Sequence, residues 1–358
     1  MTVSQRHGDL IAALRQPGYL AALDLAAWDG LLPLARAAGV LGRLATSLVR
    51  ADQLDALPPP VRWHLTAAAN AAAANRQGVA WELCCLARAF EAADYPLLLL
   101  KGAAYVAADL PPAVGRTAAD VDLLVPRDRL AAVESRLLGS GWLPAELDPR
   151  DAAYFRRWMH EIPPLRHPYR NTELDVHHNV LPRTDRLQVD PQPLLDASQP
   201  IAGTPFRTLA PADMVLHAAA HLARNGNFAR GLSDLVDIDL LIRHFHAGAG
   251  FWPALLDRAA RLRLGRPLWL VLRYAERYLH TPVPAAHRTA LDRLRPARPI
   301  IRFFDRFAPA ALLPSCLDGD DAPRHRATWL LAHYPVPRLR AMLTPLFWLK
   351  RVPVAGKT

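Results

Sequence analysis

The sequence predicts an α+β fold, in which a small β-sheet within residues 94–205 lies between two helical regions, residues 1–93 and 206–358. The middle region holds a short apolar run at residues 97–100, which is typical of a buried strand. It also holds two segments of alternating apolar and polar residues, 120–125 and 173–178, which are typical of half-buried strands. The flanking regions repeat apolar residues at three- and four-residue steps, which indicates helices.

The N-terminal region predicts three helical stretches, at residues 10–25, 31–48 and 61–90. Breaks between or within them fall at Pro17 and Gly18, at Gly39, and at the proline triplet 58–60. Nothing in this region points to chemistry of its own. We therefore expect a helical cap that packs on the core.

The central stretch, residues 97–126, contains the first candidate site. The strand at 97–100 ends at Lys101 and Gly102, and a short helix is predicted at 103–108. Backbone N–H groups at a glycine and at a helix N-terminus can approach a phosphate closely. Prolines 111 and 112 end the helix, and a second strand at 120–125 stops at Pro126.

The second strand places Asp120 and Asp122 on one face, because side chains alternate along a strand. Two neighbouring carboxylates repel each other unless a cation offsets the repulsion, and their oxygens suit Mg²⁺ or Mn²⁺. An Asp-x-Asp pair is also common as a solvated strand end. The cations nearby favour a site: Lys101 is one of only three lysines in an arginine-rich chain, and an ammonium suits a point-charge contact with phosphate. Arg116 offers a second cation.

Residues 173–178 form the second informative stretch. Alternation puts Glu173, Asp175 and His177 on one face, with Leu174 and Val176 on the buried one. Asp175 is the preferred partner for the Asp-x-Asp pair, and Glu173, at the start of the strand, is the alternative. His177 can orient Asp175, accept a proton, or bind a phosphate.

The order of these motifs resembles a known family. Lys-Gly after an apolar strand, then Arg116, then Asp120-Val121-Asp122-Leu123-Leu124-Val125, is similar to the uncharacterised nucleotidyltransferase family of bacteria, within the DNA polymerase β-like nucleotidyltransferase superfamily. Leu174-Asp175-Val176-His177 matches the family's hydrophobic-acid-hydrophobic-His strand. Gly102 is followed by Ala103, so the serine hydroxyl that commonly touches a phosphate in the superfamily is missing.

The resemblance implies a mixed sheet and a specific division of labour. Asp120, Asp122 and Asp175 would be the catalytic carboxylates and hold Mg²⁺ or Mn²⁺. Lys101, Gly102, Arg116 and His177 would bind the phosphates of a nucleoside triphosphate. The implied reaction moves a nucleoside monophosphate to an acceptor hydroxyl and releases pyrophosphate.

The C-terminal region predicts a helix over residues 211–224, which carries His217 and His221 one turn apart on a single face. A further helix begins near residue 233 and contains Asp237, which matches a recurrent acid of the family. We expect these three residues around the site rather than in contact with metal. Packing is the alternative for the two histidines, and a zinc site built from His177, His178, His217 and His221 is another. Further helices are predicted at 253–280, and short, loop-linked ones at 282–321.

Composition limits the class of protein. The chain has 358 residues, of which 51% are hydrophobic, and this favours a globular protein. Its formal charge of +10 favours anionic partners, although arginine-rich usage is also typical of GC-rich genomes. The three cysteines show neither disulfide nor zinc spacing, and the sequence has no signal-like segment or long apolar run. We therefore expect a cytoplasmic protein. The basic, aromatic tail at 338–357 suits peripheral contact with an anionic membrane, or packing.

Two functions from different classes follow. The first is a metal-dependent nucleotidyltransferase whose acceptor is a small molecule, a peptide, a protein or an RNA. The second is a non-catalytic nucleotide- or nucleic-acid-binding protein on the same scaffold, which the missing serine favours. P-loop, Rossmann and serine-hydrolase motifs are absent from the sequence.

Overall fold

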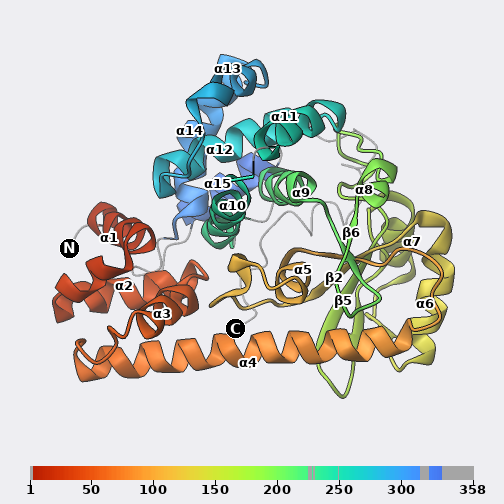
Figure 1. The fold of residues 1–358 in the computed structure, drawn as a ribbon, viewed down its shortest axis with the longest axis horizontal. Helices are drawn as coiled ribbons and strands as arrows, with labels where there is room; N and C mark the ends of the chain where they lie inside the picture. The colour runs from red at the N-terminus through yellow and green to blue at the C-terminus, as the bar shows by residue number, and fades with distance from the viewer. Residues whose placement is uncertain (1–2, 225–227, 229, 249, 315–321, 333–358) are drawn as a thin grey trace.

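The computed structural model describes residues 3–224, 228, 230–248, 250–314 and 322–332. The described chain is an α+β protein with one mixed sheet and helices on both sides of it in sequence (Figure 1). Three N-terminal helices lie at one end of the molecule and the sheet at the other. The C-terminal helices lie above both in the view of Figure 1.

The N-terminal helices follow the predicted breaks. The elements are α1 (Val3–Arg15), the 3₁₀ turn η1 (Pro17–Ala22), α2 (Leu25–Ala37), α3 (Leu41–Arg50) and α4 (Pro59–Ala89). Asp24 caps α2 by accepting the Ala27 N–H at 2.8 Å, and Gly39 supplies the left-handed residue (φ 71°) between α2 and α3. The prolines at 58–60 open α4, a 31-residue helix that extends from these helices to the sheet (Figure 1).

The sheet has seven strands in the order β3-β4-β5-β2-β1-β7-β6. Their bounds are β1 Leu98–Leu100, β2 Val121–Leu124, β3 Leu143–Pro144, β4 Leu165–His167, β5 Thr172–His177, β6 Gln199–Pro200 and β7 Arg207–Thr208. The central strand β2 pairs antiparallel with β1 and parallel with β5. The parallel register sets Asp122 opposite Asp175.

Short helices connect the strands. They are α5 (Lys101–Ala107), η2 (Pro111–Ala113), η3 (Arg127–Arg129), α6 (Leu130–Gly139), α7 (Pro149–Trp158) and α8 (Gln192–Asp196). Helix α5 begins directly after β1, two residues earlier than the predicted start at 103, and packs against α4. The amphipathic pattern of residues 127–138 also indicates a helix, and the structure has the 3₁₀ turn η3 followed by α6 there.

The C-terminal region begins with β7 of the sheet and is helical after it in its described part. It comprises α9 (Pro211–Arg224), α10 (Gly231–Phe245), α11 (Phe251–Arg261), α12 (Gly265–Leu279), α13 (Ala285–Arg293), α14 (Arg298–Leu312) and α15 (Ala322–Ala332). Helix α9 is central, with α10, α11 and α12 all packed against it, and most of its side chains are buried.

Two sequence expectations need correction. The sequence also suggests a strand over residues 160–167, but β4 starts only at Leu165, because Pro163 and Pro164 lack the N–H groups that a ladder requires. The helices expected to be short between 282 and 321 include the 15-residue α14, which keeps Pro309 inside it. The basic tail at 338–357 lies outside the described residues.

Helix α4 fixes two segments that lead to the site. Its Asn75 side chain pairs with both backbone groups of Ala118, donating to the carbonyl at 2.9 Å and accepting from the N–H at 2.8 Å. Its Glu82, buried at 1% exposure, accepts two hydrogen bonds from Arg170 and one from Thr172 at the turn between β4 and β5. One helix thereby holds the loop before β2 and the start of β5.

No single described helix is both long and apolar enough to cross a membrane. Helices α2 and α3 reach that length and composition only together, and they are bent by 116°.

Candidate metal and nucleotide site

The three predicted carboxylates meet where β2 and β5 run side by side. Asp122 lies on β2 and is 2% exposed, Asp175 lies directly opposite on β5, and Asp120 precedes β2 by one residue. Because side chains two residues apart share a face, all three belong to the same side of the sheet. Glu173, the alternative third acid, is exposed and pairs in register with Arg166 of β4 instead.

Asp122 already has two cationic or polar partners. Lys101 Nζ donates to Asp122 Oδ1 at 2.8 Å, and His177 Nε2 lies 2.9 Å from the same oxygen. Lys101 adopts a positive φ of 44° at the start of α5, a conformation that costs energy for a residue with a Cβ. Lys101 thus pairs with Asp122 in the structure, and its contact with phosphate stays a prediction.

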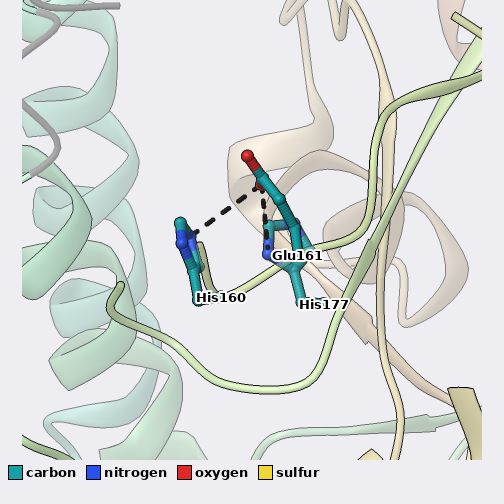
Figure 2. Close-up of side chains that lie close together, drawn as sticks. All are labelled: His160, Glu161 and His177. Atoms are coloured by element: carbon teal, nitrogen blue, oxygen red, sulfur yellow. Dashed lines mark ion pairs between the residues drawn. The ribbon is translucent and has the colours of Figure 1, made fainter. Parts of the chain in front are cut away.

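The other nitrogen of His177 faces a residue that the sequence did not predict. His177 Nδ1 lies 3.5 Å from Glu161 Oε2, and His160 Nε2 lies 3.9 Å from that oxygen (Figure 2). Glu161 reaches this place because it forms an isolated antiparallel bridge with His177. The bridge follows from pairing in three dimensions, and no periodicity in the sequence signals it.

The crowded acids differ in their pKa. Burial, the charge of Glu161 and the charge of Asp122 raise the pKa of Asp175 to about 7. Burial and Asp122 likewise raise the pKa of Asp120. Burial also acts to raise the pKa of Asp122, but the effects of Lys101 and His177 are larger and hold this pKa well below its usual range. Burial alone would lower the pKa of His177, yet the hydrogen bond to Asp122 and the charge of Glu161 raise it.

These residues fit a divalent cation. Within the described chain, Asp175 Oδ1 is buried and has no hydrogen-bond partner, which is costly for a polar atom. One ligand atom from each of Asp122, Asp175 and His177 lies within 4.8 Å of the others. Carboxylate oxygens are the ligands that Mg²⁺ and Mn²⁺ prefer. Asp122 and Asp175, with Asp120 beside them, are therefore the residues that would hold such an ion.

A second cation is packed beside Gly102. A Cβ at Gly102 would lie 2.5 Å from Arg116 Nη1, so only glycine permits this approach. Arg116 Nε donates to Asp237 Oδ2 at 2.9 Å, and the other oxygen of Asp237 accepts from the buried Arg43 of α3. Asp237 thus holds Arg116 in place through an ion pair. The contribution of Arg43 was not predicted, since the N-terminal region was expected only to cap the core.

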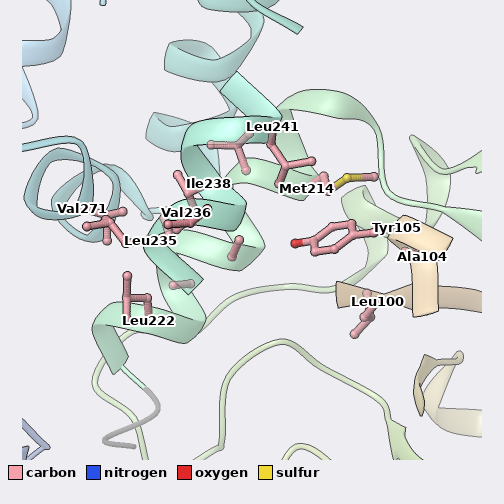
Figure 3. Close-up of a cluster of buried hydrophobic side chains, with 14 of the residues drawn as sticks. Leu100, Ala104, Tyr105, Met214, Leu222, Leu235, Val236, Ile238, Leu241 and Val271 are labelled. Carbon is pink, nitrogen blue, oxygen red and sulfur yellow. The ribbon is translucent and has the colours of Figure 1, made fainter. Parts of the chain in front are cut away.

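The histidine helix α9 faces the same site. A buried core that includes Tyr105 of α5 and Met214 of α9 holds α9 and α10 beside α5 (Figure 3). Burial and the charge of Lys101 lower the pKa of His217 to about 3 and that of His221 well below its usual value. Both side chains are therefore neutral imidazoles at pH 7. His221 Nδ1 lies 3.9 Å from Asp234 Oδ2, and burial, with the charge of Asp237, raises the pKa of this carboxyl to about 6.

Within the described chain, the four histidines suggested as a zinc site do not form one ligand cluster. Among the described residues, two sets place three metal-ligating atoms close together: Asp122, Asp175 and His177, and His160, Glu161 and His177. His178, His217 and His221 belong to neither set. Burial and the charge of Arg127 lower the pKa of His178, the first residue after β5, to about 4.

Comparison with known proteins identifies the family of the chain. No curated protein and no solved structure gives a significant match to the chain. The model of one family, described as uncharacterised nucleotidyltransferase, matches residues 24–280, well over half of the chain. The matched region runs from α2 to the end of α12 and includes each carboxylate, cation and histidine described above. The chain belongs to the uncharacterised nucleotidyltransferase family.

Proposed function

We propose that this protein is a Mg²⁺-dependent nucleotidyltransferase, which moves a nucleoside monophosphate from a nucleoside triphosphate to an acceptor hydroxyl. The observation that carries the proposal is the convergence of Asp120, Asp122 and Asp175 from two parallel strands beside the ammonium of Lys101. Membership of the family supports nucleotidyl transfer in general.

Asp120, Asp122 and Asp175 would hold the ion, as Mg²⁺ or Mn²⁺. A divalent ion bound there would neutralise phosphate charge and lower the pKa of an acceptor hydroxyl. Lys101, next to the Gly102 amide, and Arg116, held by Asp237, would bind the phosphate oxygens. His177 would keep Asp122 oriented through the 2.9 Å contact.

In the proposed reaction the acceptor oxygen attacks the α-phosphorus. The bond from that phosphorus to the bridging oxygen breaks, and pyrophosphate leaves with the electron pair. Asp175 accepts the proton of the acceptor hydroxyl, a role that suits a carboxylate placed directly opposite Asp122. The protein contributes mainly positioning and charge. A cytoplasmic location, favoured by the cysteine pattern, would supply both nucleotide and Mg²⁺.

The second candidate function is metal-independent nucleotide binding without transfer. Ala103 favours it, because the residue after Gly102 offers no hydroxyl to a phosphate. On this hypothesis Lys101 and Arg116 would bind the phosphates while the carboxylates have only a structural role.

One set of measurements tests both candidates. The full chain is incubated with each α-labelled triphosphate, Mg²⁺ and a cell extract, and labelled acceptor and pyrophosphate are followed. Asp120→Asn and Asp122→Asn should each lower turnover at least about 100-fold. Asp55→Asn, at an exposed carboxylate, is the matched control and should retain full activity.

Calorimetry with the same triphosphates separates the alternative. Binding that does not depend on Mg²⁺, with no pyrophosphate formed from any nucleotide, would replace the transferase by the binding protein.

A further inference from the structure

The cluster of His160, Glu161 and His177 lies next to the carboxylate site but has different ligand chemistry (Figure 2). We propose that these three residues form a second metal site, which binds a divalent transition-metal ion of the Zn²⁺ class. The site is distinct from the oxygen-lined position at Asp120, Asp122 and Asp175. It does not require that the protein transfer nucleotides.

The distances between the ligand atoms suit the ligands of one metal ion. The separations from Glu161 Oε2 are 3.5 Å to His177 Nδ1 and 3.9 Å to His160 Nε2. Both exceed the usual range of about 2.7–3.2 Å for a hydrogen bond. Two ligands bound at about 2.0–2.2 Å to one tetrahedral ion lie roughly 3.4 Å apart. The cluster is thus spaced for an ion with small adjustment.

The donor set selects the class of metal. Two imidazoles and one carboxylate are a common protein ligand set for zinc, with a fourth position left for water or substrate. Mg²⁺ prefers oxygen ligands alone, so it suits the neighbouring carboxylates and not this cluster.

The fold positions the three ligands before any ion arrives. The His178 N–H donates to the His160 carbonyl at 2.8 Å, and the Ile162 N–H donates to the Val176 carbonyl at 3.0 Å. These bonds tie the backbone around Glu161 to the end of β5. Glu161 and His177 are 6% and 4% exposed, so the cluster is also protected from competing water.

The remaining nitrogen of His177 completes the arrangement. Histidines that bind a metal commonly donate their other ring N–H to a carboxylate, which fixes the tautomer and the ring orientation. His177 offers Nδ1 to the cluster and Nε2 to Asp122 Oδ1 at 2.9 Å. An ion at the second site would therefore stabilise the orientation in which His177 supports Asp122.

Cobalt binding tests this site. The full chain is stripped with a chelator and titrated with Co²⁺, whose visible d–d bands report its ligand geometry in place of spectroscopically silent Zn²⁺. We expect one equivalent of Co²⁺ to give tetrahedral bands that Zn²⁺ displaces and that excess Mg²⁺ leaves unchanged. Glu161→Gln, which keeps the size of the side chain, and His160→Ala should each weaken Co²⁺ binding at least about 100-fold.

Two controls separate this site from its neighbour. His178→Ala, at the first residue after β5, and Asp120→Asn should both retain the bands. Glu161→Gln is the decisive variant if His160→Ala fails to fold, as judged by circular dichroism. Unchanged bands in folded Glu161→Gln, no tetrahedral bands in the wild type, or loss of the bands in Asp120→Asn would each overturn the proposal. None of these outcomes depends on nucleotidyl transfer.

Discussion

Lys101 Nζ lies 2.8 Å from Asp122 Oδ1, so an ammonium occupies one oxygen of the carboxylate pair proposed to bind the metal. The ion pair is well buried, with side-chain exposures of 19% and 2%. Burial acts to lower the pKa of Lys101, but the charge of Asp122 outweighs burial, so the pKa of Lys101 is raised. The ammonium and a divalent ion would therefore compete for Asp122, unless nucleotide phosphates draw Lys101 away.

Replacing Lys101 should affect metal binding and turnover in opposite directions. In Lys101→Met the competing charge is gone, so we expect Mn²⁺ to bind several-fold more tightly without nucleotide, as measured by calorimetry. Nucleotidyl transfer should fall at least about 100-fold, because a cation at the phosphates is lost. Arg62→Met, at an exposed ion pair with Asp55, is the control for both measurements. Weaker Mn²⁺ binding in Lys101→Met would contradict the competition.

The burial of Asp175 predicts a pH-dependent stability in the metal-free protein. Its pKa is about 7 in the folded chain and 3.8 in the reference state, so the unfolded chain loses its proton first as the pH rises. The contribution of Asp175 to the free energy of unfolding therefore falls between about pH 4 and pH 7, by up to about 4 kcal/mol.

Asp175→Asn removes this dependence. Relative to the wild type, the variant should gain stability progressively from pH 4 to pH 7 and hold the gain at higher pH, as measured by urea unfolding without metal. Added Mg²⁺ should stabilise the wild type but not Asp175→Asn. Glu173→Gln, at the exposed position two residues earlier, should change stability by less than about 0.5 kcal/mol. A constant difference across this pH range would contradict the role of burial.

Local pattern was sufficient to predict the strands that hold the carboxylates. The alternation in β2 and β5 set the faces of Asp120, Asp122 and Asp175, and the structure adds the parallel register that makes Asp122 and Asp175 neighbours. The pairing of Asp237 with Arg43 escaped prediction. These two residues are 194 positions apart, and only helix packing brings them together.

Glu161 was not predicted for a different reason. It stands in an irregular segment before two prolines, where neither helical nor strand periodicity assigns a face. Its position depends on a single bridge to His177. The lone acid therefore gave no signal in the sequence, although it is 6% exposed and adjoins the site.

Gly102→Ala tests the close approach of Arg116. The added Cβ would meet Arg116 Nη1 at 2.5 Å and Ala118 Cβ at 3.1 Å, so Arg116 must shift. We expect the KM for nucleoside triphosphate to rise about tenfold or more, because the guanidinium no longer lies beside the Gly102 amide. The matched control is Gly78→Ala in α4, where nothing lies within 4 Å of the new Cβ. That variant should keep the wild-type KM and gain about 0.5–1 kcal/mol of stability, because alanine favours the helix. An unchanged KM in Gly102→Ala would show that Arg116 does not contact the nucleotide.

Asp237→Asn should be among the most damaging substitutions outside the carboxylate cluster. Asp237 is 3% exposed and pairs with both Arg43 and Arg116, whose side chains are 6% and 11% exposed. Without it two buried guanidinium groups lose their counter-charge, which typically costs about 3–5 kcal/mol. Asp257→Asn removes an exposed pair with Arg261 on α11 and should cost less than about 1 kcal/mol.

Chemical denaturation of both variants measures the contrast, and transfer assays in mild conditions give the KM of Asp237→Asn. If the folded fraction of Asp237→Asn binds nucleotide as the wild type does, Asp237 only stabilises the fold. A raised KM at full folding would instead place Asp237 among the residues that position Arg116 for phosphate, because the charge that holds the guanidinium against Gly102 is missing.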